Sequence, residues 1–219
     1  MKTHTGFITI QKVLCLLLLL GYSKQHLLAQ KVFSEGIIRY DVFVNGNTQP
    51  DGTYLITVKN GFLRRELVMN SGYNNVLIYN QKSGNTTSLY ADRDNKYALV
   101  MTATEIEQQN KRFHQAQFVT GNQEKEIAGF TCKQATVKYA PNDEALFWYT
   151  PNLLPPNENF NTQFPGLSGL PLSYEIKTGK SASMQFVATL IETKSIDPKI
   201  FDVPKDYKWV TRAELENIK

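Results

Sequence analysis

The feature that most constrains this fold is the alternation of apolar and polar side chains in short stretches separated by tight turns. In the stretch of residues 35–44, Ile38, Tyr40 and Val42 alternate with charged residues, and an Asn-Gly pair follows directly. A period of two is typical of a β-strand that buries one face, and Asn-Gly favours a hairpin turn. The chain is therefore predicted to be mainly β, with antiparallel strands.

The same pattern continues through most of the chain. We predict further strands at residues 53–59, 62–69, 75–80, 86–91, 96–101, 131–139, 144–150, 172–177 and 182–190, with a hairpin at Asn60-Gly61. The sequence has no alternation of strands with long helices, no long linker and no internal repeat. These observations predict one domain over residues 31–219, built on a single antiparallel sheet that is strongly curved or part-closed.

Two segments are predicted to be helical. Residues 104–117 contain few β-branched residues, and Thr104 and Glu107 have the spacing of a capping box. Thr211 and Glu214 have the same spacing and predict a short closing helix. Residues 152–163 are rich in Pro and Asn, which indicates a loop. We expect the helices and this loop to form a partial lid over the apolar face of the sheet.

The first thirty residues are predicted to be a secretory signal peptide. Lys2 and Lys12 precede an apolar run at residues 13–20, and Ala29-Gln30 closes a polar region after it. The run is shorter than the roughly 20 residues that a membrane-spanning helix needs, and no later segment comes close. We therefore expect export to the periplasm or cell envelope, or secretion, with no integral membrane segment in the mature chain.

Removal of the signal peptide changes the charge balance. The chain has 24 Lys and Arg against 20 Asp and Glu, and residues 1–30 hold three of the Lys and no acid, which leaves 24 − 3 = 21 basic residues against 20. Because no cluster of basic residues is present either, a nucleic-acid partner is not expected. Cys15 leaves with the signal peptide, so Cys132 has no partner for an internal disulfide.

Few residues are candidates for catalysis. His114 is the one histidine after residue 30, and we expect it to be solvated on its helix. Cys132 stands at the start of a strand, where a buried structural thiol is the expected role. Asp92 and Asp94 alternate as calcium ligands do, but the glycine and distal Glu of a calcium loop are missing, which favours a hairpin tip. We expect no cofactor, no metal site and no enzymatic activity.

The strands together present one large apolar face, which either fills as a packed core or encloses a cavity for an apolar ligand. The residues themselves leave this choice open. The candidate ligand-binding residues on this face are Ile38, Tyr40, Val42, Tyr54, Ile56, Val58, Leu63, Leu67, Leu172, Tyr174, Ile176, Met184 and Phe186.

The least generic segment is FPGLSGLPL at residues 164–172. Its alternating prolines and glycines predict a rigid, tightly turned crossing between two strands. We expect its apolar side chains, Phe164, Leu167 and Leu170, to pack into the apolar face as part of its cover.

With Trp148-Tyr149-Thr150, IAGFTCK at residues 127–133 and FDVP at residues 201–204, this segment resembles the GLPGLI family of exported Bacteroidota domains and its neighbours. The chain departs from the family motif where Leu172-Ser173 replaces a second glycine and a Leu-Ile pair, so the resemblance implies a sister group. It also implies a LolA-like fold, similar to the periplasmic lipoprotein carriers, in which helices plug the mouth of an unclosed β-barrel. No catalytic residues come with it.

The sequence thus predicts an exported, non-enzymatic envelope protein that binds a lipid, an acyl chain or a lipidated partner. The alternative is a structural or protein-interaction module with a packed core and no small ligand. The sequence leaves the oligomeric state open.

Overall fold

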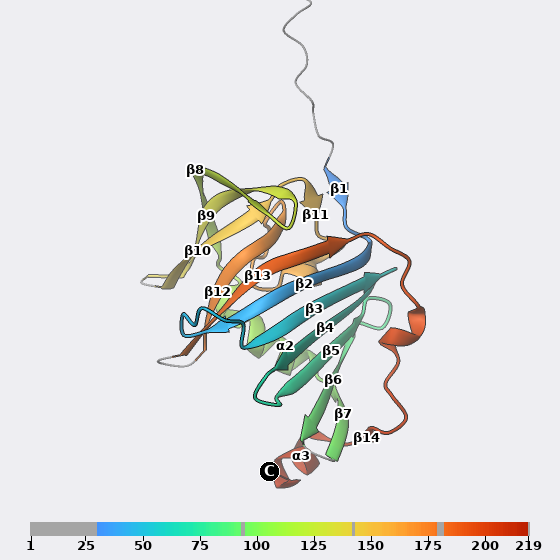
Figure 1. Cartoon of the computed structure of the whole chain (residues 1–219). Helices are drawn as coiled ribbons and strands as arrows, with labels where there is room; N and C mark the ends of the chain where they lie inside the picture. The colour runs from blue at the N-terminus through green and yellow to red at the C-terminus, as the bar shows by residue number, and fades with distance from the viewer. Residues whose placement is uncertain (1–29, 93–94, 142, 179–181, 219) are drawn as a thin grey trace, which may run out of the picture.

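The computed structural model describes residues 30–92, 95–141, 143–178 and 182–218 (Figure 1). The predicted signal peptide lies outside them except for its last residue. A sheet of twelve strands dominates the described chain, which is mainly β as predicted. The strands of this sheet are β2 (Glu35–Val44), β3 (Gly52–Lys59), β4 (Phe62–Met69), β5 (Asn74–Asn80), β6 (Asn85–Asp92), β7 (Asn95–Met101), β8 (Gln117–Ile127), β9 (Phe130–Ala140), β10 (Asp143–Thr150), β12 (Leu170–Thr178), β13 (Ala182–Glu192) and β14 (Lys208–Trp209).

The strands follow the order β14-β7-β6-β5-β4-β3-β2-β13-β12-β10-β9-β8. Strands β2 to β7 form an antiparallel meander, as the alternating pattern predicts. A short turn joins β3 to β4, where Asn60 and Gly61 have φ angles of 49° and 85° and confirm the predicted hairpin. The first long strand, β2, lies in the middle of the sheet, between β3 and β13.

The sheet is not purely antiparallel, which corrects the prediction. Strand β14 runs parallel to β7, and β1 (Lys31–Val32) forms a separate two-stranded parallel sheet with β11 (Leu153–Leu154). The predicted strands also omit β8, which pairs with β9 at the end of the sheet. Most of its side chains are exposed, so it lacks the apolar-polar alternation that predicts a half-buried strand.

The main helix begins one residue earlier than the predicted range of 104–117 and ends before it, since Gln117 already belongs to β8. Helix α2 (Ala103–Asn110) continues into a 3₁₀ turn, η1 (Lys111–Phe113), and its N-cap is Thr102 rather than Thr104. The Glu105 backbone N–H donates to Thr102 Oγ1 over 3.2 Å, and Glu105 Oε2 accepts from the Thr102 backbone N–H over 2.7 Å. The sequence contains two overlapping Thr-x-x-Glu motifs, Thr102 to Glu105 and Thr104 to Glu107. The first of them forms the capping box of the helix.

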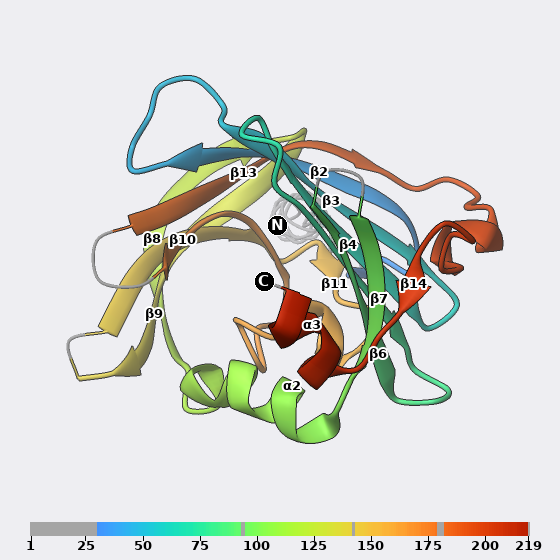
Figure 2. The ribbon, with the colours of Figure 1, turned by 90° about the horizontal axis from the view of Figure 1, so that it is seen from below.

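The closing helix forms as predicted. Helix α3 (Arg212–Ile218) follows Thr211, whose Oγ1 accepts from the Glu214 backbone N–H over 3.2 Å, and Glu214 Oε2 accepts the Thr211 backbone N–H in return. Arg212 Nε lies 2.7 Å from Glu105 Oε1 and ties α3 to α2. Figure 2 shows both helices on one side of the sheet. We call this side the inner face and the opposite side the outer face.

The largest core lies on the inner face. Phe147 of β10, with no exposed surface, has its ring 4.7 Å from that of Phe164 and 5.9 Å from that of Phe118. Phe164, Leu167 and Leu170 are all buried in this core, which confirms that the 164–172 segment covers the sheet. The segment folds back over β10 from the 3₁₀ turn η2 (Glu158–Asn161).

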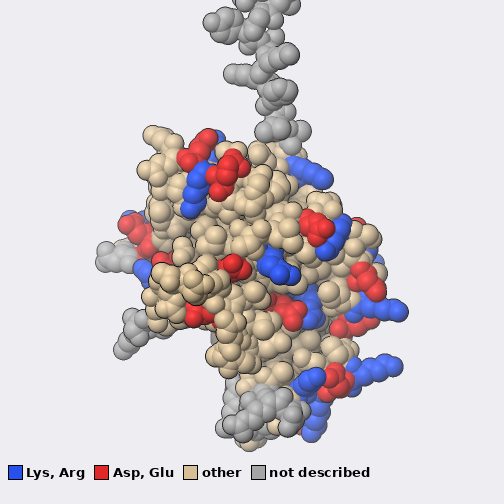
Figure 3. Space-filling model, viewed as in Figure 1, with Lys and Arg blue, Asp and Glu red and all other residues tan. Residues whose placement is uncertain are grey.

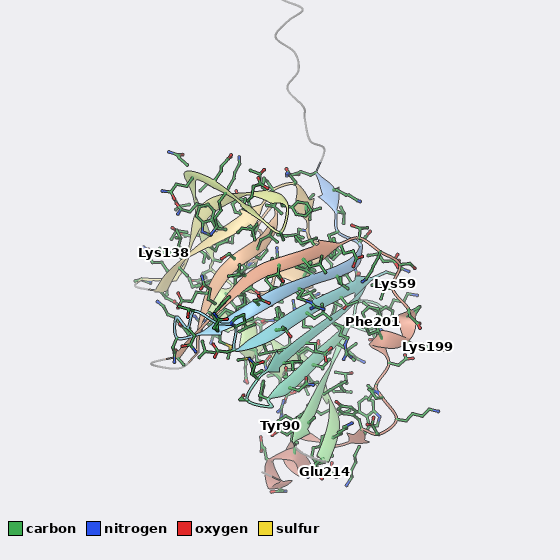
Figure 4. All side chains as sticks on the ribbon, in the orientation of Figure 1. Lys59, Tyr90, Lys138, Lys199, Phe201 and Glu214 are labelled. Atoms are coloured by element: carbon green, nitrogen blue, oxygen red, sulfur yellow. The ribbon has the colours of Figure 1, made fainter. Side chains whose placement is uncertain are left out.

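A second core lies on the outer face, and it explains why β5 is apolar on both sides. Val76 and Ile78 point outward and pack against Ile196 and Phe201, which belong to the segment after β13. That segment contains the 3₁₀ turn η3 (Pro198–Phe201), and Figure 4 shows Phe201 lying against the sheet. The C-terminal part of the chain therefore crosses the outer face before it reaches β14.

A partly buried charge pair fixes the start of this crossing. Lys59 Nζ lies 2.7 Å from Glu35 Oε1 and also donates to the Ile196 carbonyl oxygen over 2.5 Å. The Ile196 backbone N–H donates to the same Glu35 oxygen over 2.8 Å. The hydrogen bond from Lys59, followed by that from Ile196, lowers the pKa of Glu35 below its usual 4.5.

This pair predicts a dependence of stability on pH. Because the folded-state pKa of Glu35 is depressed, the stabilisation is complete above pH 4.5 or so and is lost as pH falls through the folded-state value. Urea unfolding of the wild type and of Glu35→Gln should show a stability difference that narrows between pH 6 and pH 3. A difference that stays constant over this range would contradict the prediction.

Candidate functional site

Two cavities adjoin one another on the inner face. The smaller has a volume of about 280 Å³ and lies between the sheet, α2 and the 159–164 stretch. The larger has a volume of about 530 Å³ and lies over β3, β4, β5, β12 and β13. The residues that line both cavities, and so mark their junction, are Tyr54, Arg65, Leu77, Gln163 and Tyr174.

The larger cavity has mostly apolar walls. Leu67 and Met69 of β4 face Ile176 of β12 and Met184 of β13 across it, and Phe186 completes the wall beside Tyr174. The Phe186 and Tyr174 rings stack with centroids 5.0 Å apart. Methionine side chains adapt to irregular apolar surfaces, so this wall suits a flexible hydrocarbon chain.

The smaller cavity is covered from two directions. Ile106 and Gln109 of α2 lie on one side, while Phe160 and Phe164 approach from the loop before β12. Phe113, at the end of η1, packs edge-on against Tyr139 of β9 with ring centroids 5.2 Å apart. The helix and the loop thereby form a cover over the inner face.

Arg65 brings a positive charge to this apolar surface. It lies on β4 in phase with Leu63 and Leu67, so strand alternation directs it to the inner face. Its Nη2 group donates to the carbonyl oxygen of Phe160 over 2.9 Å and to that of Asn159. The guanidinium therefore connects the sheet to the cover.

Three tyrosines surround the same region. The Tyr40 hydroxyl donates to the Pro171 carbonyl oxygen over 3.0 Å, and the Tyr40 ring lies 5.9 Å from that of Tyr174. Burial raises the pKa of Tyr40, Tyr54 and Tyr174, and the nearby charge of Arg65 opposes that rise in each of them. All three phenols therefore stay protonated at neutral pH and can donate hydrogen bonds.

The structure brings all thirteen candidate residues into one cluster on the inner face. Nine of them line the cavities: Tyr40, Tyr54, Ile56, Leu63, Leu67, Tyr174, Ile176, Met184 and Phe186. The other four are fully buried in the core beside the cavities: Ile38, Val42, Val58 and Leu172. Ligand binding by this face stays a prediction.

Sequence reasoning missed several residues of the cavity walls, Arg65 above all. Arg65 is two residues from both Leu63 and Leu67, so alternation places it on the apolar face of the strand. A charged residue on such a face is unusual, and this could have been noticed in the sequence. Leu77, Met69 and Tyr73 were missed as well, although Leu77 and Met69 belong to predicted strands.

The candidate reactive residues lie away from the cavities. Cys132 is buried as expected, its thiol donates to the Phe130 carbonyl oxygen over 3.4 Å, and burial raises its pKa to about 11. The His114 side chain is 46% exposed and its Nδ1 lies 3.5 Å from Glu107, as expected of a solvated histidine. Among the described residues, no group of three or more His, Cys, Asp or Glu could hold a metal.

Basic and acidic side chains are interspersed over the face of the molecule seen in Figure 3. Within the described part of the chain, no helix is long and apolar enough to cross a membrane.

The hairpin tip considered as a calcium loop lies between β6 and β7. It includes Asp94, which lies outside the described residues, as does the turn that follows β12.

No family model matches the chain, and no curated protein does. The resemblance to the GLPGLI domains therefore stays a prediction. Solved structures with some similarity include PNGF-II, at 14% identity and a TM-score of 0.46 over 83% of this chain and 32% of that one. The chain thus spans about a third of the length of PNGF-II.

Three further structures have lower similarity. Pseudomonas aeruginosa MucB in its complex with MucA gives a TM-score of 0.42 at 16% identity, over 82% of this chain and 59% of that one. The Mycobacterium tuberculosis lipoprotein LppX gives a TM-score of 0.30 at 11% identity, over 74% of this chain and 89% of that one. A putative outer membrane lipoprotein-sorting domain from Vibrio parahaemolyticus gives a TM-score of 0.24 at 10% identity, over 79% of this chain and 91% of that one. Scores this low carry no conclusion about function.

Proposed function

We propose that this protein is exported to the cell envelope and binds one long apolar chain, that of a lipid, an acyl group or a lipidated partner, without catalysing a reaction. The observation that carries the proposal is the larger cavity on the inner face. Its volume of about 530 Å³ falls within the usual range of roughly 300–1,000 Å³ for ligand sites. Its walls combine apolar side chains with a few polar groups, as such sites usually do.

We also propose that the sheet is bent into an unclosed, LolA-like barrel. Met101 of β7 and Tyr174 of β12 line the same small cavity, although β7 and β12 stand seven places apart in the sheet order. In a flat sheet they would be roughly 34 Å apart, at about 4.8 Å per strand. The arrangement of the strands around a central region in Figure 2 supports the same interpretation.

The energy of burial fits reversible binding. Transfer of a sixteen-carbon acyl chain from water to an apolar cavity is favourable by about 0.8 kcal/mol of free energy per methylene group, or roughly 12 kcal/mol in all. The cost of association is roughly 4–15 kcal/mol, so the net affinity is moderate. A protein of this kind can take up its ligand and give it away again.

The cavities also weigh against the packed interaction module. In a packed module the side chains of the inner face would fill the space between the sheet and its cover. Here Leu67, Ile176 and Met184 are only partly buried, and they border a cavity. Native mass spectrometry of the protein purified from the periplasm tests the two readings: bound lipid supports the proposal, and a consistently empty protein contradicts it.

A filling substitution tests the location of the site. We expect Leu67→Trp to occupy part of the larger cavity and to lower the affinity for palmitate at least tenfold, measured by displacement of a fluorescent fatty acid. Val68→Trp is the matched control, because Val68 is the next residue on β4 and points to the outer face, with 39% of its surface exposed. Equal affinities for the two variants would place the ligand elsewhere.

A further inference from the structure

Arg65 is the one charged residue among the described residues that line the two cavities. No Asp or Glu in the described part of the chain forms an ion pair with it. Arg212, which lines a third cavity next to the larger one, is different because Glu105 neutralises it at 2.7 Å. The cavity pair therefore carries an uncompensated positive charge.

The hydrogen bonds of Arg65 use only part of its capacity. Nη2 donates to the Phe160 and Asn159 carbonyl oxygens, while Nε and Nη1 have no partner among the described residues. A guanidinium has five N–H donors, and its planar shape suits carboxylate and phosphate oxygens. Donors remain for a ligand that reaches the junction of the cavities.

Other donors stand at the same junction. The hydroxyl groups of Tyr54 and Tyr174 and the side-chain amide of Gln163 belong to residues that line both cavities. Burial raises the pKa of both tyrosines, and the nearby positive charge of Arg65 opposes that rise. An anion beside Arg65 would meet only neutral donors around it.

We infer that the ligand of this site is an anionic amphiphile, whose carboxylate or phosphate group binds Arg65 at the junction while its hydrocarbon chain fills the larger cavity. This inference rests on the proposed function. An unpaired charge in an apolar cavity is costly, and an anionic head group removes that cost when it pairs with the guanidinium. A neutral head group offers no such compensation, and a cationic one is repelled.

Ligands of equal chain length test the head group on the wild-type protein. We expect palmitate and hexadecyl phosphate to displace a fluorescent probe at concentrations about tenfold or more below that of hexadecanol, because charge-assisted hydrogen bonds are about twice as strong as neutral ones. Inorganic phosphate alone should not displace the probe, since it lacks the chain. Displacement by inorganic phosphate at equal concentration would assign the site to free phosphate and overturn the inference.

The outcomes separate the inference from the proposed function. If hexadecanol binds as tightly as palmitate, the assignment of the head group is wrong and the apolar site stands. If neither binds, both are wrong. This comparison needs no mutation, so it holds even if changes at Arg65 disturb the fold.

Substitutions then test Arg65 itself. Arg65→Gln should remove the preference for palmitate over hexadecanol, and Arg65→Lys should keep most of it. Arg64→Gln is the matched control, because Arg64 is the neighbouring residue, faces outward and pairs with Glu66 at 3.1 Å. Thermal unfolding checks that each variant is folded. A folded Arg65→Gln variant that keeps the wild-type preference would overturn the inference.

Discussion

Replacing Gly169 with valine should destabilise the protein by about 3 kcal/mol or more, because the segment before β12 has no room for a side chain at this position. A Cβ atom on Gly169 would lie 2.6 Å from the Thr150 carbonyl oxygen and 2.6 Å from Cδ2 of Tyr149, both on β10. Neither neighbour is the free end of a flexible side chain, so the segment would have to lift away from the core. Urea unfolding followed by circular dichroism measures the loss.

Gly166 is the matched control within the same segment. It has a φ angle of +81°, but no atom lies within 4 Å of the position of its Cβ. Gly166→Ala should therefore cost only the strain of a left-handed residue, roughly 1–2 kcal/mol. Equal losses for the two variants would show that crowding does not decide the role of this segment. A Gly169→Val protein with normal stability and impaired palmitate binding would show that its role is functional rather than structural.

The second large effect is expected at Phe147. Its side chain has no exposed surface and contacts three other aromatic rings, those of Phe118, Tyr149 and Phe164. Phe147→Ala should therefore cost about 3–5 kcal/mol, which is a large part of the total stability of most domains. The drop in the urea midpoint at unchanged slope measures this cost.

Leu146 provides the comparison for this variant. It precedes Phe147 on β10, points to the other face and is 54% exposed. We expect Leu146→Ala to change stability by no more than about 0.5 kcal/mol. A loss similar to that of Phe147→Ala would mean that the outer surface of β10 is covered in solution.

Strands could be predicted from the sequence where one face of the strand is buried and the other is exposed to solvent. Strand β2 shows this best, because Ile38, Tyr40 and Val42 are buried while Arg39 is exposed. The same logic fails for β8, where most side chains are exposed, as at Val119 with 67% of its surface accessible. The alternating pattern reports burial, and an edge strand with little burial leaves no such pattern.

The end of the chain was hard to predict for a different reason. Residues 197–204 have no periodic pattern in the sequence. Their Phe201 packs on the apolar outer side of β5, at Val76 and Ile78. A tertiary contact between residues so far apart in the chain leaves no local trace in the sequence.

The candidate site was predicted in part. Alternation placed the thirteen apolar residues on one face, since side-chain direction in a strand depends only on local geometry. Which of them line a cavity depends on how the cover fits over the sheet, so Leu172 and Tyr174 could not be told apart. Arg65 was not among the candidates because only the apolar residues of the face were chosen, although its phase on the strand is that of Leu63 and Leu67.

The central place of β2 in the sheet has a consequence for how the molecule folds. Its partner β3 follows it directly, whereas its other partner, β13, is synthesised nearly at the end of the chain. Until residues 182–192 have been synthesised and paired, β2 is an open edge of the sheet formed by β2 to β7. Open strand edges promote association with other chains. Pairing across so long a stretch of chain is also intrinsically slow. The period between the emergence of β2 and that of β13 is therefore when a holding chaperone would protect this protein most.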